Sequence, residues 1–149
     1  MGTSVSPGRP TIAEIDLKAL AFNYRQIRKR TPKGVSILAV VKADAYGHGA
    51  LPVSLKLEKM GVEYLGVAIR EEGVELRKGG VKAPILIFGG IFKGDAEVII
   101  RYGLTPVVFD IESLKHLSKA AEKRKKKARV HIKVDTGMGR LGVPFELFP

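Results

Sequence analysis

The sequence predicts an α/β fold built from repeated strand–helix units, and three observations lead to this prediction. Short β-branched apolar runs alternate with longer amphipathic stretches, and Gly or Pro marks most of the junctions between them. The runs begin roughly 20 to 30 residues apart, which is room for a strand, a crossover helix and two short loops. The 149 residues are 45% hydrophobic, which is enough for the core of one domain.

The five apolar runs are the expected parallel strands. In chain order they span residues 36–42, 64–69, 85–88, 106–110 and 129–135. Each run is short and rich in Val, Ile or Leu, as is typical of buried strands. A further short run at residues 11–15 is expected to form a separate edge strand.

Amphipathic stretches before and between these runs predict helices. Asp16 is expected to cap a first helix that carries Leu17, Leu20, Tyr24 and Ile27 on one side. Four more helices follow, each closed by glycine or by a basic turn. They are expected at residues 51–60, 71–78, 95–102 and 112–126.

Periodicity leaves two architectures open, an open doubly wound sheet and a (β/α) barrel, because both use the same right-handed unit. The fifth run favours the barrel. Its Val130, Ile132 and Val134 alternate with polar residues, whereas a parallel strand between two helix layers should be apolar on both sides. A closed barrel needs eight strands and about 250 residues. We therefore expect about the first five βα units of an incomplete barrel.

Composition narrows the function classes. The chain has no cysteine, so disulfides and thiolate metal sites are excluded, and we expect no metal site. No apolar run approaches the ~20 residues of a membrane span, and we expect a cytoplasmic protein with no membrane partner. The net charge of +11 keeps a nucleic-acid-binding module as one alternative. The densest basic run, residues 123–127, follows a predicted helix, where cations are ordinary.

Lys42 is the first candidate for chemistry, because it stands at the carboxyl end of the first apolar run. In α/β proteins the reactive groups collect at these strand ends. An amine that leaves an apolar strand is partly shielded from water and is suited to forming an imine with an aldehyde. The loop that follows contains Tyr46, Gly47, His48 and Gly49, and it matches neither nucleotide-binding glycine motif. We interpret His48 as a loop-packing residue.

The polar side of the fifth run carries a second group of candidates. His131 and Lys133 lie on this side, and three glycines in residues 136–142 let the chain turn and bring Arg140 back across the strand ends. A guanidinium is permanently cationic and forked, which suits a carboxylate or a phenolate.

Residues 39–49, AVVKADAYGHG, closely resemble the pyridoxal-phosphate attachment motif of the alanine racemase family. Residues 131–142, HIKVDTGMGRLG, resemble the second N-terminal signature of the same family, and residues 10–17 are similar to its opening segment. The three motifs occur in order and cover almost the whole chain.

This resemblance implies a fold-type III enzyme dependent on pyridoxal 5'-phosphate (PLP), with an N-terminal (β/α)8 barrel and a C-terminal β domain. It implies that Lys42 binds the cofactor and is one of two acid–base groups at Cα of the substrate. It places Tyr46 on the phosphate side of the cofactor, and Arg140 near the cofactor's phenolic oxygen and the substrate carboxylate. Lys133 matches a lysine that is often carbamylated and then orients the arginine.

The resemblance also implies racemisation of L- and D-alanine by a homodimer, which supplies D-alanine for peptidoglycan. In the family the second base is a tyrosine from the C-terminal domain of the partner subunit. We expect residues 1–149 to be a partial PLP-binding barrel domain without that β domain, marginally stable, prone to self-association and inactive alone. Two alternative functions stay open, a broad-specificity amino-acid racemase and a non-catalytic PLP-binding barrel protein.

Overall fold

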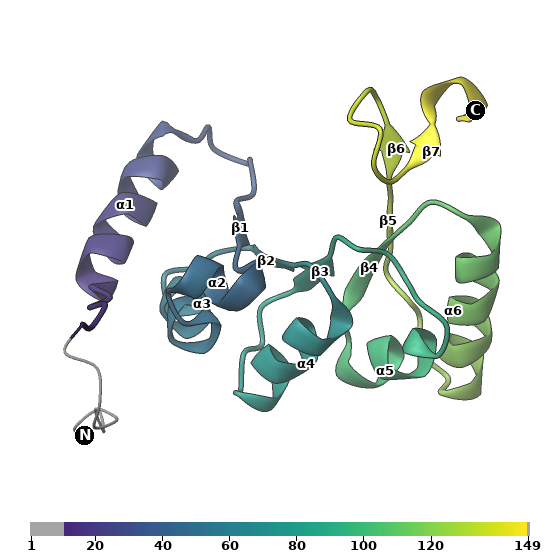
Figure 1. Cartoon of the computed structure of the whole chain (residues 1–149), viewed down its shortest axis with the longest axis horizontal. Helices are drawn as coiled ribbons and strands as arrows, with labels where there is room; N and C mark the ends of the chain where they lie inside the picture. Colours follow the sequence, from purple (N-terminus) through teal and green to yellow (C-terminus); the bar gives the residue numbers. More distant parts are fainter. Residues whose placement is uncertain (1–10, 149) are drawn as a thin grey trace.

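Five parallel strands form one sheet in a computed structural model that describes residues 11–148. The strands pair in chain order, and Figure 1 shows them side by side across the middle of the molecule. Within the described residues the outer edges of the first and last strands are unpaired, so the barrel is not closed. The strands are β1 (Leu38–Val40), β2 (Tyr64–Val67), β3 (Ile85–Ile87), β4 (Thr105–Val108) and β5 (His131–Ile132).

The predicted helices are confirmed, with bounds that shift by a few residues at most. Asp16 caps the first of them, because its Oδ1 accepts a hydrogen bond of 2.6 Å from the Lys18 N–H. The expected edge strand at 11–15 is wrong, since this segment pairs with no strand. The helices are α1 (Leu17–Arg30), α3 (Ala50–Lys59), α4 (Arg70–Lys78), α5 (Asp95–Tyr102) and α6 (Ile111–Lys123).

Helices α3 to α6 cover one face of the sheet, which we call the outer face (Figure 1). Leu65, Val67, Ile85 and Ile87 point into this helix layer and are almost wholly buried. They meet apolar side chains from the helices, such as Leu76 of α4. This alternation leaves the other residues of each strand for the opposite, inner face.

The inner face is packed most closely around Gly66 of β2. A Cβ at this position would lie 2.6 Å from the ring of Phe88 and 2.8 Å from Leu38, so both neighbouring side chains lean over the glycine. Alternation along β2 places Tyr64 on the same face, and its ring meets His131 of β5 edge-on at 6.0 Å. Side chains from β1, β2 and β5, and that of Phe88 directly after β3, therefore converge on one interior.

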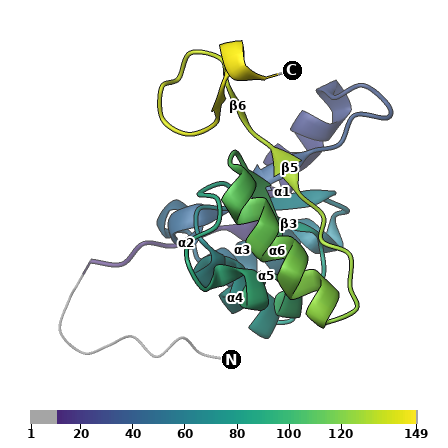
Figure 2. The ribbon, with the colours of Figure 1, turned by 90° about the vertical axis from the view of Figure 1, so that its right-hand side faces the viewer.

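The fifth apolar run differs from its prediction, because it divides at Lys133 into β5 and β6 (Val134–Asp135). The Lys133 N–H donates to the Val108 carbonyl at 2.9 Å, which continues the sheet. The Lys133 carbonyl accepts from Val143 at 2.8 Å, which starts the pairing of β6 with β7 (Val143–Pro144). Figure 2 shows this last part of the chain, which ends in η1 (Phe145–Leu147), extending beyond the sheet.

The basic run follows the end of α6, as predicted. Lys123 and Arg124 lie 2.9 and 3.2 Å from the carboxylate of Glu97 on α5, so part of this charge is paired within the fold. Among the helices that the structure describes, none has both the length and the apolar character needed to cross a membrane.

Candidate active site

A cavity of about 550 Å³ lies on the inner face and brings together the four site residues predicted from the sequence. Lys42, Tyr46, Lys133 and Arg140 all line it, although they are up to 98 residues apart in the chain. Its apolar walls come from the strands and from the residue directly after β3. They include Val40, Leu86, Phe88 and Val107.

Lys42 reaches this cavity because the sheet fixes the residue before it. The Val41 N–H donates to the Gly66 carbonyl of β2 at 2.8 Å, and the Val41 side chain is buried on the outer face. Lys42 comes next, is partly buried, and holds its ammonium nitrogen 6.0 Å from the centre of the Tyr46 ring. Strand pairing thus places an amine at the mouth of the interior, as the position of Lys42 after an apolar run predicted.

The backbone after Lys42 turns in an unusual way that the sequence did not reveal. Residues 43–46 of α2 (Lys42–Gly47) all have positive φ, between 51° and 55°, and form a left-handed turn. None of the four is glycine, and a left-handed helix costs L-residues about 1–2 kcal/mol each. Strain of this kind persists only where surrounding contacts hold it, and it is concentrated at functional sites.

Hydrogen bonds on both sides of the turn hold it in place. Asp44 accepts from the Ala50 N–H through Oδ1 at 2.6 Å and from the Gly49 N–H through its carbonyl at 2.9 Å. His48 lies 2.9 Å from the Ala45 carbonyl through Nδ1. The interpretation of His48 as a loop-packing residue is consistent with this contact, and His48 does not line the 550 Å³ cavity.

Glu72 also contacts the turn, and no pattern in the sequence predicted this contact. Its Oε1 accepts from the Ala43 N–H at 2.6 Å, and its Oε2 accepts from the Ala68 N–H at 2.7 Å. A glutamate three residues after the N-cap, here Ile69, can reach back to backbone N–H groups at the start of the helix, as it does in a capping box. That spacing could have predicted the local bond, whereas the bond to Ala43 depends on the pairing of β1 with β2.

Arg140 is carried by a loop that Asp135 organises. Oδ1 of Asp135 accepts from the N–H groups of Gly137 and Gly139 at 3.0 and 3.1 Å. These bonds hold the pKa of the Asp135 carboxyl below its usual value, because they stabilise the ionised form. The bond from Gly139 has the largest effect and the bond from Gly137 the next largest. Lys133 adds a smaller Coulombic contribution in the same direction. The three glycines of this loop all adopt positive φ.

The electrostatics of the cavity favour an anionic ligand. Three cations, Lys42, Lys133 and Arg140, line it, and no Asp or Glu is among the described residues of its wall. Cations in a confined site raise the local concentration of negatively charged molecules. The phenol of Tyr46 adds a neutral hydrogen-bonding group at the same rim, where its side chain is exposed.

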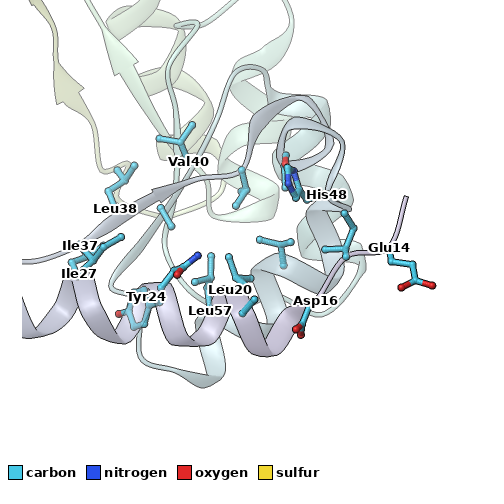
Figure 3. A pocket seen from close by; sticks show the side chains of 17 residues that line it. Glu14, Asp16, Leu20, Tyr24, Ile27, Ile37, Leu38, Val40, His48 and Leu57 are labelled. Atoms are coloured by element: carbon cyan, nitrogen blue, oxygen red, sulfur yellow. The ribbon is translucent and has the colours of Figure 1, made fainter. Parts of the chain in front are cut away.

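A second cavity, of about 650 Å³, lies between α1 and β1 and has a different character (Figure 3). Leu20, Tyr24, Ile37 and Leu57 contribute to its largely apolar lining. His48 lies at one end of it. Lys42, Lys133 and Arg140 do not line this cavity, so the reactive groups predicted from the sequence are gathered in the first one.

Comparison with known proteins agrees with the motifs around this site. The sequence profile described as "Alanine racemase, N-terminal domain" matches residues 15–149. The chain belongs to the alanine racemase N-terminal domain family. The chain is 49% identical to the alanine racemase of Geobacter sulfurreducens over 138 residues, which are 93% of this chain and 36% of that protein.

Solved alanine racemase structures share the fold. That of Clostridium difficile 630 superposes with a TM-score of 0.88 at 40% identity, over 93% of this chain and 36% of the other. That of Bartonella henselae, described with covalently bound pyridoxal phosphate, has a TM-score of 0.77 at 30% identity, over 89% and 37%. The fold is therefore that of the TIM-barrel domain of alanine racemases, of which five strands are present in residues 11–148. The chain spans about a third of the length of these relatives.

Proposed function

We propose that this chain is the N-terminal, PLP-binding part of an alanine racemase, and that the whole protein interconverts L- and D-alanine. The observation that carries the proposal is the convergence of Lys42, Tyr46, Lys133 and Arg140 on one cavity of the inner face. The same cavity lies at the carboxyl end of β1, where the chemistry of (β/α) barrels is found.

The residues present fit PLP. The cofactor carries an aldehyde, a phenolic oxygen and a phosphate, and the cavity offers an amine, a phenol and two further cations. Lys42 would bind the aldehyde covalently. Tyr46 would contact the phosphate, and Arg140 the phenolic oxygen, with the fork of the guanidinium suited to an anionic oxygen. When bound, PLP supplies an electron sink that stabilises negative charge at Cα of the substrate.

The protein's own groups would then orient the substrate and move its proton. Lys42 would hold or release the Cα proton on one face of the substrate, as a general acid–base group. Arg140 would also bind the substrate carboxylate. Carbamylation would turn Lys133 from a cation into an anion, which removes its repulsion of Arg140 and orients that guanidinium. The further residues of the whole protein would supply its β domain and the partner surface of a homodimer.

Covalent trapping tests this proposal on the 149-residue chain. The chain is incubated with an equimolar amount of PLP, reduced with borohydride and mapped by peptide mass spectrometry. We expect one pyridoxyl phosphate per chain, on Lys42, because this amine lies beside the cavity's other cations. Lys42→Ala should remove this label.

Lys59→Ala is the matched control, because Lys59 is an exposed lysine at the end of α3 and outside the cavity. It should leave the labelling of Lys42 unchanged. Labelling spread over exposed lysines, or a Lys42→Ala variant that is labelled as fully as the unsubstituted chain, would contradict the proposal.

A further inference from the structure

The left-handed turn after Lys42 needs support from outside, because its residues would otherwise relax to an ordinary backbone conformation. The first N–H groups of any helical turn have no acceptor within the turn. Ala43 provides one of these N–H groups, and it directly follows Lys42. Its hydrogen-bond acceptor therefore fixes the peptide next to the residue that carries the amine.

Glu72 is that acceptor, and its two oxygens do different things. Oε2 accepts from Ala68 and Ile69, four and three residues away, at 2.7 and 3.3 Å, which is a local cap at the start of α4. Oε1 accepts from Ala43 at 2.6 Å, across 29 residues of sequence. The second contact contributes nothing to the cap of α4 and joins this helix to the Lys42 turn.

We propose that Glu72 is a positioning residue, whose carboxylate holds the turn in its left-handed form and thereby fixes the direction in which Lys42 enters the cavity. Lys42 is fixed on one side by the bond from Val41 to Gly66 and on the other by the bond from Ala43 to Glu72. The expected effect of Glu72 on the reaction of Lys42 with PLP rests on the proposed function, whereas its effect on the turn rests on the hydrogen bonds alone.

These hydrogen bonds require a carboxylate at position 72, because each of its two oxygens accepts from N–H donors on a different side. A glutamine has one acceptor oxygen, and its amide nitrogen would face an N–H donor on one of the two sides. In Glu72→Gln the oxygen is expected to stay with the nearby donors of Ala68 and Ile69, which are closer in sequence, so that the bond to Ala43 is lost. We call the contact between Glu72 and Ala43 the bridge. The substitution should remove this bridge and keep the cap of α4.

Hydrogen exchange measured on the full 149-residue chain without cofactor tests the bridge. In Glu72→Gln we expect exchange in residues 42–49 to become about tenfold faster, as expected for the loss of one hydrogen bond to a charged group. Exchange in α4 should stay unchanged, because its cap is kept. The control is Glu75→Gln, on an exposed residue of the same helix, and it should change neither segment. Unchanged exchange in residues 42–49, or an equal increase in α4, would overturn the proposal.

Glu72→Asp provides a second variant in case the glutamine variant does not fold. Aspartate is favoured in the first turn of a helix and still caps it, but it is one methylene shorter and would not reach Ala43. The same selective increase in exchange is expected for it. If both variants slow exchange, or leave it as in the unsubstituted chain, Glu72 does not hold the turn.

Trapping with PLP and borohydride tests the consequence for Lys42. We expect the rate of labelling at Lys42 to fall about tenfold in Glu72→Gln, while labelling of other lysines stays the same. If the unsubstituted chain is not labelled at Lys42, the proposed function fails, and the exchange experiment still decides the role of Glu72 in the turn. If both chains are labelled at Lys42 at the same rate, the positioning role fails and the proposed function stands.

Discussion

Single carboxylates around the candidate site act on backbone N–H groups and so determine where the cations lie. Asp44 and Glu72 hold the turn that carries Lys42, and Asp135 holds the loop that carries Arg140. Hydrogen bonds to an ionised group are stronger than neutral ones. Each of these carboxylates therefore stabilises a short segment whose conformation is otherwise unfavourable or flexible.

Asp135 makes the loop of Arg140 dependent on pH. The N–H groups of Gly139 and Gly137 lower the pKa of this carboxyl in the folded chain below the ordinary value of 3.8. Their contribution to loop order is therefore complete above that ordinary value and is lost as the pH falls through the lowered one. We expect exchange in residues 136–142, corrected for its intrinsic pH dependence, to accelerate only in strong acid.

Asp135→Asn should give faster loop exchange already at neutral pH, because the neutral amide is a weaker acceptor. Glu146→Gln changes an exposed carboxylate in η1 and is the control, with no expected effect on the loop. Equal exchange in Asp135→Asn and the unsubstituted chain at neutral pH would show that the loop does not depend on this carboxylate.

The sequence predicted the cations of the site better than the residues that hold them. Lys42 follows an apolar run and Lys133 lies on the polar side of a strand, but it was the resemblance to the alanine racemase motifs that assigned both to the site. Glu72 could not be found in this way, because its contact with Ala43 exists only once β1 and β2 are paired. A residue that accepts from a distant backbone N–H leaves no periodic pattern.

At the level of elements, the apolar runs predicted five strands and the amphipathic stretches predicted five helices, all of which are present. The expected strand at 11–15 failed, because a short apolar run does not by itself provide a neighbouring strand with which to pair. The left-handed turn of residues 43–46 was also missed. No glycine marks it, and its conformation depends on bonds from Glu72 and Asp44, so local propensity predicts an ordinary loop.

The cap of α6 shows how much one helix end contributes. Asp110 Oδ1 accepts from the Ser113 N–H at 2.7 Å, and this bond is the first cause of a lowered pKa for the Asp110 carboxyl. We expect Asp110→Ala to lower the free energy of unfolding by about 1 kcal/mol, measured by urea denaturation. Asp110→Asn keeps an acceptor and should cost less. A larger loss for Asn than for Ala would show that the capping bond is not the cause.

Across the described part of the molecule, the two faces of the sheet differ in what they form. The outer face with its helices forms the core that holds the strands in register, and the inner face converges on the cavity of Lys42. At β5 this division is incomplete, because Ile132 belongs to the outer side by alternation and is 60% exposed. An exposed apolar residue on a strand whose outer edge is unpaired favours association with other chains.

Activity is the prediction that belongs to the molecule as a whole. Inversion at Cα needs acid–base groups on both faces of the substrate, and Lys42 is the candidate for one of them. The family resemblance assigns the second group to a tyrosine in the C-terminal domain of a partner subunit. We therefore expect the 149 residues with PLP to give no measurable interconversion of L- and D-alanine. Chiral chromatography of the two enantiomers measures this. The Geobacter sulfurreducens relative is the positive control. Interconversion by these residues that disappears in Lys42→Ala would show that the cavity of the inner face holds both groups.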